Sequence, residues 1–230
     1  MTTPVLNLGE MLAANARLYP DRIGARDLER QLTFRRWNAR ACRLANALVG
    51  LGLRKGDRVA ILAYNALEWV EVYAATAKAG LVMVPINFRL TASEISFIIE
   101  NSGASVLIVE DQLVPTIEEI GRDLPIAPQR CIVFGASKAP AAFHAYEALL
   151  AAAQDREPGV RVDPADPWAL MYTSGTTGRP KGAIRSHGAS ALLSLITAIE
   201  FKLSQRDTAL LVMPLCHANS LFFYGAFSYC

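Results

Sequence analysis

Ten consecutive residues, 173–182, combine side chains that suit the binding of phosphate groups. The stretch contains four hydroxyl residues, three glycines and one lysine. In chain order it consists of Thr173, Ser174, Gly175, Thr176, Thr177, Gly178, Arg179, Pro180, Lys181 and Gly182. Glycines let backbone N–H groups turn inward, hydroxyls add donors, and lysine supplies a compact positive charge. We therefore expect a loop that holds a polyphosphate.

The order of residues in this stretch excludes the common nucleotide-triphosphatase loop. That loop requires Gly-Lys followed by Ser or Thr, whereas here Pro180 precedes Lys181 and Gly182 follows it. The alternative is a flexible surface loop rich in Ser, Thr and Gly. We disfavour it because such loops rarely place a lysine after a rigid proline directly beyond a buried strand.

A second candidate is His217, in the stretch Met-Pro-Leu-Cys-His-Ala-Asn at 213–219. Taken alone, a single histidine beside apolar residues is more often a core group than a catalyst. We interpret Cys216 as a small packing residue rather than a nucleophile. For His187 a structural role is favoured over a phosphate contact, and Arg185 is expected to be a solvated charge.

Composition indicates a folded α/β protein. Of the 230 residues, 52% are hydrophobic and 19% charged, which excludes disordered and low-complexity classes. The net charge of +2, without a basic run, gives no reason to expect a nucleic-acid partner. The four cysteines and three histidines are scattered, so neither a disulfide scaffold nor a metal site is predicted. Reduced thiols in a cytoplasmic protein are the expectation.

Short apolar runs alternate with helical periodicity, which predicts layers around a mostly parallel sheet. Strands are expected at 22–27, 30–33, 58–63, 81–84, 105–109, 130–134 and 168–172. Helices are expected at 7–18, 35–49 and 187–199, and one more within 139–166. Two further helices should begin at capping boxes, one at Asn65 with Glu68 and one at Thr91 with Glu94.

The two ends of the chain differ in character. The first seventeen residues lack the features of a secretory signal. The 23 residues 208–230 contain no Asp, Glu, Lys or Arg, which is long enough to span a bilayer. Polar residues near the middle, among them His217 and Asn219, favour instead a buried strand, a polar turn and a buried helix. A chain that ends within such a run is expected to be a truncated form or a fragment, with a membrane anchor as a lesser alternative.

The stretch 173–182 closely resembles the phosphate-loop signature of the adenylate-forming superfamily, which includes acyl-CoA synthetases, adenylation domains of peptide synthetases and beetle luciferases. Other segments resemble the same family, namely residues 32–34, 51–68 and 77–87. Arg36 departs from the family, where glutamate is common, in an element that is structural there. The resemblance covers essentially the whole chain but only the front part of the family pattern.

The resemblance implies an N-terminal portion of a layered αβαβα fold. Residues 51–200 would form an α/β subdomain that bears the phosphate loop, while 1–50 and 201–230 would belong to a second, incomplete subdomain. It also implies an ATP-dependent acyl-CoA synthetase, in which a carboxylate attacks ATP and coenzyme A captures the acyl-adenylate. Mg²⁺ is expected, with its family ligand beyond Cys230. We expect residues 1–230 alone to be inactive, with the rest of the chain as their partner.

Within that scheme, the hydroxyls of Thr173, Ser174, Thr176 and Thr177 and the N–H groups of Gly175, Gly178 and Gly182 would hold phosphate. Lys181 would offset charge on pyrophosphate, and His217 would orient the acid. Ala218 stands where amino-acid-activating relatives place an aspartate, so a fatty or other non-amino acid is favoured. The alternatives are an amino-acid adenylation fragment and a non-catalytic relic that binds phosphate. The identity of the acid and the oligomeric state stay undetermined.

Overall fold

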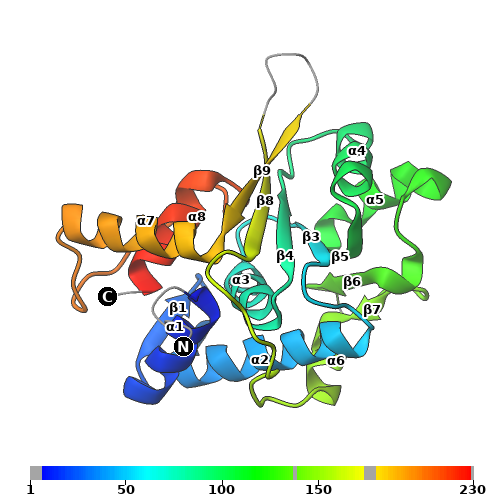
Figure 1. The fold of residues 1–230 in the computed structure, drawn as a ribbon. Coiled ribbons are helices and arrows are strands. Elements are labelled where there is room, and N and C mark those ends of the chain that lie inside the picture. Colours follow the sequence, from blue (N-terminus) through cyan, green and yellow to red (C-terminus); the bar gives the residue numbers. More distant parts are fainter. Residues whose placement is uncertain (1–6, 137–138, 174–179, 229–230) are drawn as a thin grey trace.

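Residues 7–136, 139–173 and 180–228 are described by the computed structural model. Within them, one seven-stranded sheet has the order β7-β6-β5-β3-β4-β8-β9 (Figure 1). Its strands are β3 (Arg58–Leu62), β4 (Val82–Ile86), β5 (Ala104–Glu110), β6 (Cys131–Phe134), β7 (His144–Ala145), β8 (Pro167–Thr173) and β9 (Lys181–Ser186). Every neighbouring pair is parallel except β8 and β9, which form an antiparallel hairpin. This confirms the predicted layered α/β class with a mostly parallel sheet.

The sheet is covered by helices on both faces. One face carries α1 (Leu8–Leu18), α2 (Phe34–Gly50), α3 (Leu67–Ala79), α6 (Tyr146–Ala152), α7 (His187–Glu200) and α8 (Ala218–Ser228). The other carries α4 (Ala92–Ser102) and α5 (Val114–Ile120), as Figure 1 shows. Successive residues of a strand point to opposite faces. Val59 and Ile61 accordingly join the first core, and Ala60 and Leu62 join the second.

Residues 7–50 pack on the outside of this sheet's first helical layer. A two-stranded antiparallel pair, β1 (Ile23–Arg26) and β2 (Gln31–Thr33), leads into α2. Thr33 caps α2 by accepting a hydrogen bond from the N–H of Arg36. Because α1 and α2 cover α3 from outside, every residue of α3 is buried. A helix covered on all sides is expected to be apolar around its whole circumference, and α3 largely is.

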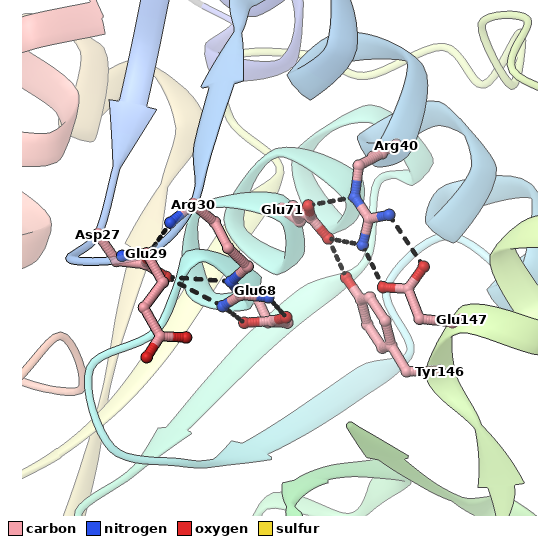
Figure 2. Close-up of polar contacts among 8 residues, drawn as sticks. All are labelled: Asp27, Glu29, Arg30, Arg40, Glu68, Glu71, Tyr146 and Glu147. Atoms are coloured by element: carbon pink, nitrogen blue, oxygen red, sulfur yellow. Dashed lines mark hydrogen bonds and ion pairs between the residues drawn. The ribbon is translucent and has the colours of Figure 1, made fainter. Parts of the chain in front are cut away.

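Buried charges of α3 are paired with residues of α2, of α6 and of the turn between β1 and β2. Glu71 accepts hydrogen bonds from Arg40 of α2 at 2.5 Å and from the Tyr146 hydroxyl of α6 at 2.7 Å (Figure 2). Glu68 is bound by Arg30 at 2.7 Å, and Arg30 in turn contacts Asp27. These ion pairs tie the N-terminal elements to the central helix. Each buried carboxylate thus keeps a partner, as burial of a charge requires.

Most predicted elements are confirmed within about two residues. The capping box at Thr91 and Glu94 is present, with both reciprocal bonds formed. The box predicted at Asn65 and Glu68 is wrong: α3 begins at Leu67, and Ala66 precedes it without a side-chain cap. Glu68 is drawn into the pair with Arg30 instead, and the side chain of Asn65 bonds to residues far along the chain.

The strand predicted at the start of the stretch 208–230 is also wrong. Residues 208–213 form an irregular segment in which Leu210 and Val212 are 85% and 74% exposed. A strand needs a neighbour to share its backbone hydrogen bonds, and among the described residues none lies beside this segment. The helix that follows is confirmed as α8.

A membrane anchor is the lesser alternative predicted for residues 208–230. In the ranges that the structure describes, none of the helices combines the length and apolar character that crossing a bilayer requires.

Candidate functional site

The hairpin β8–β9 carries the two stems of the predicted phosphate loop. Thr173 is the last residue of β8 and lies opposite Lys181, the first residue of β9. Both are exposed. The predicted residues between them lie outside the described part of the chain, namely Ser174, Gly175, Thr176, Thr177 and Gly178. The stems therefore present a threonine and a lysine, side by side, to solvent.

The face to which these two side chains point follows from the pleat of the strands. Thr173 is in phase with Ala169 and Met171, whose side chains belong to the core beneath α3 and α8. Residues directly opposite in an antiparallel pair share a face, so Lys181 points the same way as Thr173.

Gly182 lies on the opposite face, where it packs closely against Leu170 and Tyr172. A Cβ atom there would lie 2.8 Å from Leu170 Cδ1 and 3.3 Å from the ring of Tyr172. The Tyr172 hydroxyl donates to Asn101 Oδ1 at 2.7 Å, which ties the hairpin to α4. Gly182 thus has a packing role at the base of the loop, and its phosphate contact stays a prediction.

His217 lies exposed immediately before α8. Its Nδ1 accepts a hydrogen bond from the N–H of Asn219 at 3.3 Å, and its carbonyl accepts from the N–H groups of Ser220 and Leu221. In the neutral ring the proton is then on Nε2. Nε2 is therefore a donor that faces away from the helix end, which suits contact with a carboxylate.

Asn65 and Tyr73 bind the segment before His217, although neither was predicted to belong to the site. The Asn65 side chain bonds to backbone groups of residues 211–215, and the Tyr73 hydroxyl donates to the carbonyl of Leu215. Leu215 and Cys216 are buried in the first core, on the same face as α3. No local pattern could have revealed these contacts, because their partners are separated by more than 140 residues.

Asn65 and the stem residue Thr173 lie at the same edge of the sheet. The carboxyl ends of parallel strands lie at a common edge, and Asn65 follows β3 while Thr173 ends β8. Since only β4 separates these strands, their ends are about 10 Å apart. Ligands of open α/β sheets bind at this edge. The structure thus brings the stems of the phosphate loop and the His217 segment to the same edge and the same face.

Arg185 lies within β9, and His187 follows that strand. His187, the first residue of α7, is fully buried, and burial lowers the pKa of its imidazole to about 4. A ring without solvent access supports the structural role predicted for it. Arg185 was expected to be solvated, but it is half-buried, and burial lowers the pKa of its guanidinium.

Cys216 and Ala218 flank the histidine. Burial raises the pKa of the Cys216 thiol, which suits a packing residue rather than a nucleophile. Ala218 is exposed and carries no charge, so the position next to His217 offers no counter-charge to an ammonium group.

A hollow of about 270 Å³ between α2 and α6 contains none of these residues. Much of its charged lining is already paired, because Arg40 binds Glu71 and Glu147 (Figure 2) and Arg43 binds Asp155. We therefore place the candidate site at the carboxyl edge of the sheet, not in this hollow. Across residues 7–136, 139–173 and 180–228, no three His, Cys, Asp or Glu side chains are grouped to hold a metal ion.

The sequence is similar to known proteins over nearly its whole length. Residues 12–229 match the family model described as AMP-binding enzyme. The long-chain-fatty-acid–CoA ligase FadD13 of Mycobacterium tuberculosis (strain H37Rv) is 37% identical over 220 residues, which are 94% of this chain and 42% of that protein. The chain therefore spans less than half the length of that relative.

Two solved structures share the fold. A putative long-chain-fatty-acid CoA ligase from Rhodopseudomonas palustris aligns with a TM-score of 0.86 and 29% identity, over 96% of this chain and 55% of that one. The anthranilate CoA ligase AuaEII, solved in complex with anthranoyl-AMP, aligns with a TM-score of 0.79 and 28% identity, over 84% of this chain and 37% of that one. The described region thus corresponds to one part of larger ligases.

Proposed function

Because this chain belongs to the AMP-binding enzyme family, we propose that it is part of an ATP-dependent ligase that joins a carboxylic acid to coenzyme A. In the first step a carboxylate oxygen forms a bond to the α-phosphorus of ATP, the bond to the β-phosphate oxygen breaks, and pyrophosphate leaves. In the second step the thiolate of coenzyme A attacks the acyl carbon and AMP leaves. The named relatives act on a fatty acid and on anthranilate.

One observation carries this proposal: Lys181 and Thr173 share a face and an edge of the sheet with the segment that bears His217. A bound ATP whose phosphates lie at the hairpin would have its α-phosphorus toward the sheet edge, where His217 Nε2 can donate to the carboxylate. The lysine ammonium offsets the charge that develops on pyrophosphate. Preorganised donors of this kind stabilise a transition state without reorganisation.

We assign the phosphate contacts to the hydroxyls of Thr173, Ser174, Thr176 and Thr177 and to the N–H groups of the loop glycines, as the sequence predicts. We expect Mg²⁺ to accompany ATP and give it no ligand among the described residues. The three described cysteines are free and buried, which supports the proposed cytoplasmic location.

The proposed substrate is a fatty or other non-amino acid. An amino acid would bring an ammonium group next to Ala218, where no counter-charge is present. Leaving such a charge desolvated and unpaired is expected to cost several kcal/mol. Exchange of pyrophosphate into ATP, measured with short-chain, long-chain, aromatic and amino acids, tests this choice directly.

The decisive variant is Lys181→Ala in the full-length protein. We expect pyrophosphate–ATP exchange to fall by about 10²-fold or more, as when one preorganised donor is removed. Lys202→Ala is the matched control, because Lys202 is exposed and follows the far end of α7. Unchanged exchange in Lys181→Ala would remove this lysine from the mechanism.

A second experiment measures acyl-CoA synthesis by the 230-residue chain alone. We propose that it does not synthesise acyl-CoA, because it spans 42% of the FadD13 sequence. Acyl-CoA formation by the purified chain would contradict this, whereas absence of pyrophosphate exchange by the full-length protein with every acid tested would favour a non-catalytic phosphate-binding protein.

A further inference from the structure

The side chain of Asn65 connects two segments of the chain that are 150 residues apart. Its Oδ1 accepts a hydrogen bond from the N–H of Leu215 at 2.7 Å. Its Nδ2 donates to the carbonyl of Met213 at 3.0 Å and, at 3.4 Å, to that of Leu211. Both ends of one amide group are thus engaged with alternate residues of a five-residue stretch.

This pattern resembles the bonds that a neighbouring strand would make. Residues 211–215 are irregular and have no strand beside them in the described parts of the chain. Val212 and Met213 are 74% and 45% exposed, so within this stretch the apolar contacts with the first core come from Leu211 and Leu215. The amide of Asn65 therefore supplies the backbone partners that this segment would otherwise lack.

A second side chain binds the same residue. The buried Tyr73 hydroxyl, from α3, donates to the carbonyl of Leu215. Both backbone polar groups of Leu215 are consequently bound, its N–H by Asn65 and its C=O by Tyr73. Leu215 is two residues before His217, and the turn between them is closed by a 2.9 Å bond from His217 N–H to the Pro214 carbonyl.

The position of Asn65 in the fold makes this connection specific. It follows the carboxyl end of β3, at the same edge of the sheet as the stem residue Thr173. A side chain that leaves this edge and binds 211–215 therefore sets where His217 stands relative to the phosphate loop.

From these contacts we propose that Asn65 is a positioning residue for His217, acting with Tyr73 through the backbone of Leu215; this rests on the acid-orienting role proposed for His217. Asn65 contacts neither ATP nor the acid in this scheme. Its loss allows the histidine to move away from the carboxylate, and small displacements of a positioned group lower catalytic rates strongly.

The test compares Asn65→Ala with Asn46→Ala in the full-length protein. Asn46 is a matched control, because its Nδ2 also donates to two carbonyls, those of Gln154 and Arg156, both at 2.8 Å, in a loop remote from His217. We expect Asn65→Ala to lower kcat/KM for the acid by about 10-fold while the KM for ATP changes less than 2-fold. Asn46→Ala should leave both values within 2-fold of the parent.

A double-mutant cycle separates positioning from general damage. If Asn65 acts through His217, Asn65→Ala should have no further effect on activity once His217→Ala is present. An equal loss in both backgrounds would overturn the proposal. Tyr73→Phe, which removes only the hydroxyl, provides a second variant of the same anchor should Asn65→Ala fail to fold.

Hydrogen exchange gives a readout that does not depend on activity. Amides of residues 211–217, that of Leu215 above all, should exchange at least 10-fold faster in Asn65→Ala and remain unchanged in Asn46→Ala. Unchanged exchange in Asn65→Ala would overturn the inference even if activity falls. Absence of pyrophosphate exchange in the parent with every acid would instead refute the proposed function, while the exchange of these amides would still test the anchor.

Discussion

The helices α3 and α7 lie on the same face of the sheet but differ in whether their buried polar groups have partners. α3 is buried throughout, and its charged side chains Glu68, Glu71 and Lys78 all have ion-pair partners. α7 instead exposes large apolar side chains, with Leu192 at 56% and Ile199 at 72%. At its buried side, His187 and Ser190 have polar atoms without a hydrogen-bond partner among the described residues.

The difference shows what surrounding elements contribute to polar burial. Arg40 of α2 and Tyr146 of α6 bind Glu71, and Arg30 binds Glu68, so burial of these charges on α3 is compensated (Figure 2). α7 is covered mainly by α8, an apolar helix that offers no polar partner to His187 or Ser190. Removing the partner of a buried charge on α3 should therefore lower the free energy of unfolding strongly. Removing a buried polar group that has no partner on α7 should not lower it.

The largest expected effect is at the buried pair of α3. Replacing Arg40 by Met leaves the Glu71 carboxylate buried without its main partner, and loss of one member of a buried pair costs about 3–5 kcal/mol. Urea unfolding followed by tryptophan fluorescence measures this loss. Arg43→Met on the same helix removes a more exposed pair with Asp155 and should cost less than about 1 kcal/mol. Equal losses in the two variants would contradict the comparison.

A pH-dependent effect is expected at the start of α7. Burial lowers the pKa of His187 from 6.5 to about 4, and the helix N-terminus also disfavours a cation there. Between these values the unfolded chain binds a proton that the folded chain does not. Stability should therefore fall as pH decreases from about 6.5 to about 4, by about 3 kcal/mol.

His187→Phe tests that dependence, because it keeps a ring beside Trp168 but cannot take up a proton. Over this pH range the free energy of unfolding of the variant should fall by about 3 kcal/mol less than that of the parent. Identical slopes for His187→Phe and the parent would exclude the buried imidazole as the source.

The smallest effects should have opposite signs on the two helices. The Thr76 hydroxyl of α3 donates to the Val72 carbonyl at 2.8 Å, so Thr76→Val should destabilise by about 1 kcal/mol. Ser190→Ala on α7 removes a buried hydroxyl without a described partner and should stabilise by about 1 kcal/mol. Denaturation midpoints of the two variants provide the measurement, and a loss in both would show that Ser190 has a partner after all.

Much of the architecture could be predicted because its signals are local. The apolar runs of β3, β4 and β5 and the capping box at Thr91 depend on neighbouring residues, and the structure confirms them. The prediction failed at Asn65, where the spacing to Glu68 matched a helix start but both side chains bond elsewhere. It failed again at 208–213, where apolar residues alone could not show whether a neighbouring strand was available.

The sequence by itself determined the α/β class, the order of the elements and the residue types of the candidate phosphate loop, since strand and helix periods and turn residues are properties of short segments. Only the tertiary structure decided that Lys181 and Thr173 share a face and an edge with the His217 segment, and that Asn65 and Tyr73 hold that segment. Contacts between residues some 150 positions apart depend on how the sheet is assembled, and they leave no periodic trace in the chain.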